Sequence, residues 1–209
     1  MRNILCFGDS NTFGVIPTGG RYPIDVRWPG RLQTLLGEEY HIIEEGMGGR
    51  TTVFQDPFEP GRCGAEILPV LLSSHKPLDL VIISLGANDC KRIFNATPRI
   101  VAKGIEKLCE IVKEFDYGGN PAPQLLVMSP AYILEGVEDG PYPLFDPTSP
   151  SISRGLSEYY LKVAMRFNAL FLDASEIAKA SPVDCLHLDE ESHLNIAEAT
   201  ATLINEYFK

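Results

Sequence analysis

Short runs of apolar residues recur along the chain and alternate with segments whose apolar positions repeat about every 3.6 residues. Uninterrupted apolar runs are typical of parallel strands covered on both faces, and the 3.6-residue repeat is typical of helices. The predicted strands are Ile4–Phe7, His41–Glu44, Leu80–Leu85, Gln124–Ser129 and Leu170–Asp173. The predicted helices are Arg27–Leu36, Ala65–Ser74, Ile100–Phe115, Ser153–Phe167 and Glu190–Phe208.

This alternation predicts an α/β protein of one domain, residues 1–209. Strands that alternate with helices are joined by right-handed crossovers, which place helices on both faces of a parallel sheet. We therefore expect a three-layer, flavodoxin-like fold with a five-stranded parallel sheet. The loop at residues 118–123 is not a domain linker, because the segments on both sides continue the same alternation.

Composition and charge narrow the possible partners. Hydrophobic residues make up 44% of the chain and charged residues 22%, as in ordinary globular proteins. A formal net charge of −10 argues against a nucleic-acid partner, which requires clustered lysine and arginine. No apolar run approaches the roughly 18 residues of a transmembrane helix, so no membrane association is expected.

The cysteines and histidines indicate a metal-free protein of a reducing compartment. The first predicted strand follows Arg2-Asn3 directly, which leaves no room for a signal peptide. An odd number of cysteines, five, without such a signal favours reduced thiols and a cytoplasmic location. The chain has no C-x-x-C pair, and its four histidines show no metal-ligand spacing with the cysteines. We expect no metal and no cofactor.

A serine and an acid–base pair stand near opposite ends of the chain. Ser10 lies in FGDSNTFG directly after the first predicted strand, at the carboxyl edge where open α/β sheets bind ligands. DCLH places Asp184 three residues before His187. Serine, aspartate and histidine are the components of a nucleophilic triad, in which the imidazole takes the serine proton and the carboxylate holds the imidazole.

Two further motifs supply hydrogen-bond donors. GMGGRTT (46–52) follows the second apolar run, and GAND (86–89) follows the third. Backbone N–H groups at the glycines and the side-chain amide of Asn88 are the donors that acyl-transfer enzymes direct at a developing oxyanion.

With these four motifs in order, the chain resembles the SGNH (GDSL) hydrolases over nearly its whole length. EEGMGGRTT, DVRWPG (25–30) and PLDLVIISLGAND (77–89) resemble the arylesterase/acyltransferase branch of that superfamily. The resemblance implies a cofactor-independent serine esterase acting on small carboxylic esters, with acyl transfer to alcohols as a further activity, and a homo-oligomer. It assigns the triad to Ser10, Asp184 and His187 and the oxyanion hole to Ser10, Gly49 and Asn88. Asn11 and Gly48-Gly49 replace the leucine and the Ser-Ala pair common in related arylesterases.

Other residues compete for these roles. His193 falls within a predicted helix, which favours a structural role, and Asp173 is placed to cap a helix. Asp9 is expected to hydrogen-bond its own loop, and Cys185 to act as a small apolar filler rather than a nucleophile. Ser84 and Ser129 have no acid–base pair near them in the sequence.

Two other functions fit the sequence less well. A flavodoxin-like phosphate- or nucleotide-binding module would cradle a phosphate with Ser10, Thr12 and Gly14, but it leaves the D-x-x-H motif unexplained. An α/β-hydrolase would require a G-x-S-x-G motif, which the chain lacks, and a later serine.

The segment Ala131–Pro150 is unusual because it combines four prolines with seven large apolar residues. Long loops of this kind in a compact domain are usually functional. We expect it either to form a wall of an acyl pocket or to pack against another subunit.

Overall fold

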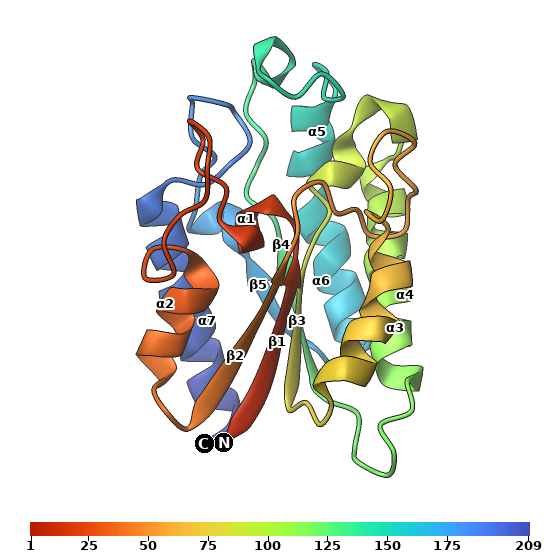
Figure 1. Ribbon diagram of the computed structural model, residues 1–209. Helices are drawn as coiled ribbons and strands as arrows, with labels where there is room; N and C mark the ends of the chain where they lie inside the picture. The colour runs from red at the N-terminus through yellow and green to blue at the C-terminus, as the bar shows by residue number, and fades with distance from the viewer.

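Five parallel strands form one sheet in the order β2-β1-β3-β4-β5 (Figure 1). The computed structural model describes all 209 residues. The strands are β1 (Arg2–Gly8), β2 (Tyr40–Gly46), β3 (Leu80–Ser84), β4 (Gln124–Ser129) and β5 (Leu170–Asp173). This is the flavodoxin-like strand order, and the predicted strands are confirmed to within a few residues.

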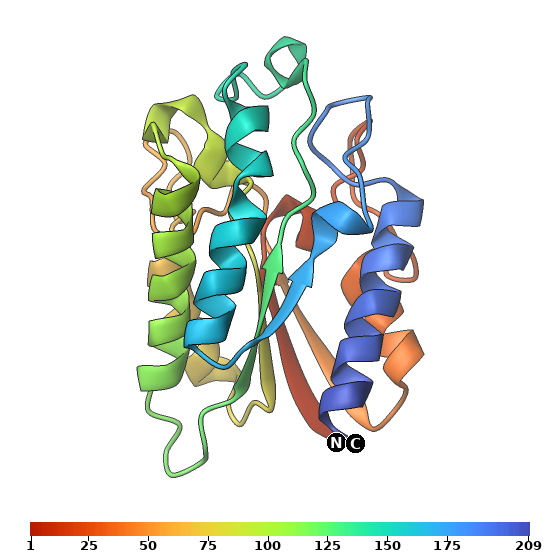
Figure 2. The ribbon, with the colours of Figure 1, turned by 180° about the vertical axis from the view of Figure 1, so that it is seen from behind.

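Helices cover both faces of the sheet, as Figures 1 and 2 show. On one face lie α2 (Trp28–Leu36) and α7 (Glu190–Tyr207), which pack against each other. On the other face lie α3 (Gly64–His75), α4 (Pro98–Glu114) and α6 (Leu156–Arg166). The predicted three-layer α/β fold is therefore confirmed.

The apolar runs of the strands reflect this double coverage. In β1, Leu5 and Phe7 belong to the core on the side of α3, α4 and α6, whereas Ile4 and Cys6 belong to the core on the side of α2 and α7. All of these side chains are fully buried. A strand with solvent on one face would alternate apolar and polar residues instead.

The predicted helix Ser153–Phe167 was wrong in one respect, because it is two helices separated at Gly155. The first, α5, spans Ser149–Arg154, and α6 begins at Leu156. Gly155 lies against Pro98, where a Cβ atom would come within 2.7 Å of the proline ring. The missing side chain lets the chain pass close to the start of α4.

The carboxyl ends of the strands lie at one edge of the sheet, where the chain carries most of its predicted site residues. β2 lies on one side of β1 and β3 on the other, so the strand order changes direction at β1. Open α/β sheets bind ligands at such a switch point. No helix is both long enough and apolar enough to cross a membrane.

Candidate active site

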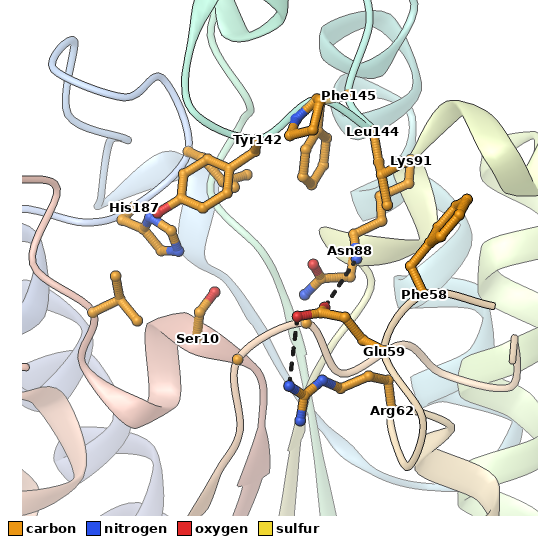
Figure 3. A pocket seen from close by; sticks show the side chains of 15 residues that line it. Ser10, Phe58, Glu59, Arg62, Asn88, Lys91, Tyr142, Leu144, Phe145 and His187 are labelled. Atoms are coloured by element: carbon orange, nitrogen blue, oxygen red, sulfur yellow. Dashed lines mark ion pairs between the residues drawn. The ribbon is translucent and has the colours of Figure 1, made fainter. Parts of the chain in front are cut away.

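Ser10 is the first residue of α1 (Ser10–Phe13), a one-turn helix that directly follows the end of β1. The Asp9 carboxylate caps this helix by accepting the Asn11 N–H at 3.0 Å. Gly8 makes the sharp strand-to-helix turn possible, because a Cβ atom there would overlap Thr12 Oγ1. The Ser10 side chain points toward the imidazole of His187 (Figure 3).

His187 and Asp184 form a buried hydrogen-bonded pair. Asp184 Oδ2 lies 2.6 Å from His187 Nδ1. The other carboxylate oxygen, Oδ1, accepts the backbone N–H groups of Leu186 at 3.1 Å and His187 at 2.9 Å. Burial raises the pKa of Asp184, but these hydrogen bonds outweigh it and leave the pKa below its usual value. The carboxylate is thus charged and fixed, and the pair leaves His187 Nε2 available toward Ser10.

The loop between β4 and α5 packs over this pair. The Tyr142 ring makes an edge contact with the imidazole, with the ring centroids 5.2 Å apart. The Leu134 N–H donates to the Cys185 carbonyl at 2.9 Å. Cys185 itself has a φ of +62°, which turns the chain tightly between the acid and the base. The Ala131–Pro150 segment therefore contacts the predicted triad directly.

Three donors face the same space. The N–H groups of Ser10 and Gly49 have no protein acceptor, and Gly49 has a φ of +75°, a conformation that favours glycine. Asn88 Nδ2 donates one hydrogen to the Arg50 carbonyl at 3.2 Å, which leaves its second hydrogen free. The structure thus brings all three predicted oxyanion donors to one edge of the sheet.

A buried carboxylate supports the donor loops. Asp89, with no exposed surface, accepts the Thr52 N–H at 3.1 Å and the Thr52 hydroxyl. Burial raises the pKa of Asp89 to about 7, and the hydrogen bonds from Thr52 act in the opposite direction. Asp89 therefore joins the loop after β3 to the loop after β2.

The predicted nucleophile, base and oxyanion donors line a cavity of about 530 Å³ (Figure 3), a size typical of small-molecule sites. Ser10, Asn88 and His187 lie on its wall together with Gly48 and Gly49. The apolar part of the lining consists of Val15, Phe58, Tyr142, Pro143, Leu144, Phe145 and Leu186. Four of these come from the Ala131–Pro150 segment, so the segment lies at the wall of this cavity, which is one of the two positions expected for it.

The cavity also has a charged wall that the sequence analysis missed. Lys91 Nζ is paired with the buried Asp56 carboxylate at 2.8 Å. Glu59 lies between two cations, 3.9 Å from Lys91 Nζ and 3.6 Å from Arg62 Nη2. Lys91 directly follows the GAND-Cys segment, which was a usable signal, but nothing in the sequence indicated that the loop after GMGGRTT returns to the site.

The competing residues lie elsewhere or have other partners. His193 is fully buried in α7, accepts the Trp28 N–H at 3.3 Å and does not line the cavity. Asp173 accepts the Ser175 N–H at 3.0 Å, and so caps the following turn as predicted. Cys185 is half-buried, with its Sγ 3.4 Å from the Glu135 carbonyl, so it is only partly the apolar filler expected.

Two ligand hypotheses can be compared with the geometry. Thr12 has no exposed surface, so its hydroxyl cannot cradle a phosphate beside Ser10. No group of three or more histidine, cysteine, aspartate or glutamate side chains is arranged to hold a metal ion.

Comparison with known proteins points to one family. Residues 6–197 match the model of the GDSL-like lipase/acylhydrolase family. A search of curated proteins gave no match. Among solved structures, a carbohydrate acetylesterase from Sinorhizobium meliloti is 36% identical, with 99% of this chain and 100% of that chain covered and a TM-score of 0.93. The native aryl esterase of M. smegmatis is 35% identical, with 99% of both chains covered and a TM-score of 0.91.

The family model covers almost the entire chain, and the similar structures extend over its full length. A phosphate- or nucleotide-binding module without catalysis is therefore wrong. The protein belongs to the GDSL-like lipase/acylhydrolase family and is a carboxylic ester hydrolase.

Proposed function

We propose that the protein hydrolyses small aryl or alkyl esters through an acyl-enzyme on Ser10. The observation that carries this proposal is the convergence of Ser10, the His187–Asp184 pair and Asn88 on one cavity. These residues come from the ends of two strands, β1 and β3, and from the C-terminal segment, and a purely structural role would not require them to face one space.

Acylation begins when Ser10 Oγ attacks the ester carbonyl carbon and His187 Nε2 takes the hydroxyl proton. The carbonyl oxygen becomes an oxyanion, which accepts hydrogen bonds from the Ser10 N–H, the Gly49 N–H and Asn88 Nδ2. The Asp184 carboxylate stabilises the imidazolium. The C–O bond to the alcohol then breaks, and the imidazolium gives its proton to the leaving alcohol.

Deacylation repeats these steps with water as the nucleophile. His187 takes a proton from water, the hydroxyl adds to the acyl carbon, and Ser10 leaves with the proton returned by the imidazolium. An alcohol that takes the place of water yields a new ester instead of an acid. Seven apolar lining residues favour a weakly hydrated cavity, in which alcohol competes well with water.

The size and lining of the cavity favour small substrates. About 530 Å³ accommodates a short acyl group with an aryl or small alkyl alcohol. Aromatic lining residues such as Tyr142 and Phe145 suit an aryl group, and the charged wall of Glu59, Arg62 and Lys91 suits hydroxyl groups on an alcohol. Related structures described as an aryl esterase and a carbohydrate acetylesterase agree with both types of alcohol.

The proposal is tested with Ser10→Ala and a panel of acetate, butyrate and hexanoate esters of phenol and of short alcohols. We expect the variant to fold and to lose on the order of 10⁴–10⁶ in kcat, because triad residues act as a unit. A fluorophosphonate should label Ser10 in the wild type. An active Ser10→Ala protein, or a label on Cys185, would overturn the assignment. Product analysis in the presence of methanol separates hydrolysis from acyl transfer.

The proposed homo-oligomer now rests on other surfaces than the Ala131–Pro150 segment. The seven large apolar residues of that segment are buried or half-buried within one chain. Exposed apolar side chains instead occur at Ile24, Phe58, Val70, Met165 and Val183, each at least 61% exposed. Light scattering at micromolar concentration tests the proposal. The proposed cytoplasmic location is supported by the five unpaired cysteines.

A further inference from the structure

The side chain of Asn11 connects the nucleophile to the segment that carries the proposed base. Asn11 Oδ1 accepts the Leu188 N–H at 3.0 Å, across 177 positions of sequence. Asn11 Nδ2 lies 3.5 Å from the Leu186 carbonyl oxygen, at the upper limit of a hydrogen bond. One amide therefore contacts the main chain on both sides of His187.

No other hydrogen bond joins residues 8–14 to residues 180–189. The remaining hydrogen bonds of the histidine segment stay within the C-terminal part of the chain or reach the loop before α5. The Ser181 N–H donates to the His187 carbonyl at 2.7 Å, and the Leu134 N–H donates to the Cys185 carbonyl. These hydrogen bonds fix the shape of the segment but do not reach α1.

The helix that carries the nucleophile, α1, is held separately by the end of β2. Gly46 at the end of β2 lies directly under α1, where a Cβ atom would come within 2.1 Å of the Phe13 nitrogen. Ser10 is therefore fixed relative to β1 and β2. His187 is held by its own segment and by the loop before α5, with Leu188 packed in the core that contains Ile4 and Cys6 of β1. Proton transfer between them depends on how the histidine segment is aligned with α1.

We propose that Asn11 is a positioning residue that aligns His187 with Ser10 by holding the main chain on both sides of the imidazole. The inference rests on the proposed Ser10–His187–Asp184 triad. It concerns a residue that neither lines the cavity nor reacts. A small displacement of a reacting group has a large effect, since about 1 Å costs on the order of 10²-fold in rate.

Two variants test this proposal. Asn11→Leu keeps the approximate size of the side chain and removes both contacts. Asn11→Asp keeps an acceptor for the Leu188 N–H, loses the donor to Leu186, and adds a negative charge near the imidazole. Asn195→Leu is the matched control. Asn195 lies in α7, away from the cavity, and its Nδ2 donates to the Ile177 carbonyl at 2.9 Å.

With active sites counted by complete fluorophosphonate labelling, Asn11→Leu should lower kcat on the order of 10–100-fold with little change in KM. Asn11→Asp should retain more activity than Asn11→Leu, and the acidic limb of its kcat/KM profile should move to higher pH. The control should lose stability but keep the wild-type kcat per active site.

The proposal is overturned if Asn11→Leu behaves like Asn195→Leu, with the wild-type kcat and pH profile. If Asn11→Leu does not fold, the nearly isosteric Asn11→Asp decides, and an unchanged kcat and pH profile would overturn it. Failure of the triad gives a different result, because Ser10→Ala would then remain active whatever the Asn11 variants do.

Discussion

Asn88 donates its side-chain amide to the main-chain carbonyl of Arg50 at 3.2 Å, across 38 positions of sequence. This hydrogen bond fixes the rotation of the amide. It uses only one of the two amide hydrogens, so the second is free. It also joins the loop after β3 to the loop that carries Gly49. The side-chain donor and a backbone donor of the proposed oxyanion hole therefore move together, which is the preorganisation that transition-state stabilisation requires.

Removal of this amide should slow the chemical step. Asn88→Ala is expected to lower kcat by on the order of 10²–10³, the usual cost of one oxyanion donor. KM should change much less, because the bond strengthens as the oxyanion forms. Steady-state kinetics on one aryl acetate measure both constants. A raised KM with an unchanged kcat would instead make Asn88 a substrate-binding residue.

Asp184 should be essential although it does not touch the substrate. Asp184→Asn is expected to lower kcat by roughly 10⁴, because the amide no longer favours the tautomer with a proton on Nδ1. Asp173→Asn is the matched control, since the Asp173 carboxylate also accepts a backbone N–H but caps a turn outside the cavity. The control should keep its kcat in the same assay. Equal losses in the two variants would contradict the assignment of Asp184.

Most of the fold followed from the sequence because double-sided burial leaves a local pattern. Runs such as Leu80–Ile83 are apolar at every position, and the structure places alternate residues in the two cores. The helix boundary at Gly155 was missed, because it depends on the contact with Pro98, 57 positions away. A periodic pattern alone does not contain that contact.

For the site, the residues predicted from motifs converge on one cavity, whereas residues from loops without a motif were missed. Glu59 and Arg62 reach the cavity because the loop after GMGGRTT folds back over Gly49. Asn11 was noted only as a departure from related arylesterases. Its contacts with Leu186 and Leu188 depend on tertiary structure, so no spacing in the sequence could indicate them.

His193 should make stability depend on pH. Burial lowers the pKa of this histidine from 6.5 to about 4. Between these values the unfolded chain binds a proton that the folded chain does not, so the free energy of unfolding falls as the pH falls from 6.5 to 4. The loss amounts to roughly 3 kcal/mol at the acidic end.

His193→Gln isolates this contribution when urea unfolding of both proteins is compared at pH 7, 5.5 and 4. Burial raises the pKa of Asp9 to about 6 and that of Asp89 to about 7, which acts in the opposite direction in both proteins and cancels in the comparison. The variant should be less stable at pH 7, and the difference should shrink toward pH 4. A difference that is constant with pH would show that His193 does not contribute through its protonation.

Activity should survive removal of metal ions. The proposed reaction uses only side chains and backbone N–H groups, and no cluster of three potential ligands is present. After exhaustive dialysis against EDTA, kcat and KM on an aryl acetate should equal those of the untreated enzyme. Loss of activity that zinc or another divalent ion restores would contradict the metal-free mechanism.

Leu144 should limit the length of the acyl chain. Its side chain lines the cavity, while its carbonyl accepts the Arg92 N–H at 2.7 Å, so truncation should open space without moving the main chain. Leu144→Ala is expected to raise kcat/KM for butyrate and hexanoate relative to acetate by about 10-fold or more, because each methylene accommodated in an apolar pocket contributes roughly 1–3 kcal/mol.

The control for Leu144→Ala is Leu161→Ala, on the exposed surface of α6 and away from the cavity. It should leave the ratio of butyrate to acetate hydrolysis unchanged. Esters with a constant acetyl group and alcohols of increasing length separate the two ends of the substrate. If Leu144→Ala changes the preference for the alcohol and not for the acyl chain, the Ala131–Pro150 segment borders the leaving group, and the acyl chain must lie toward Phe58 and the charged wall.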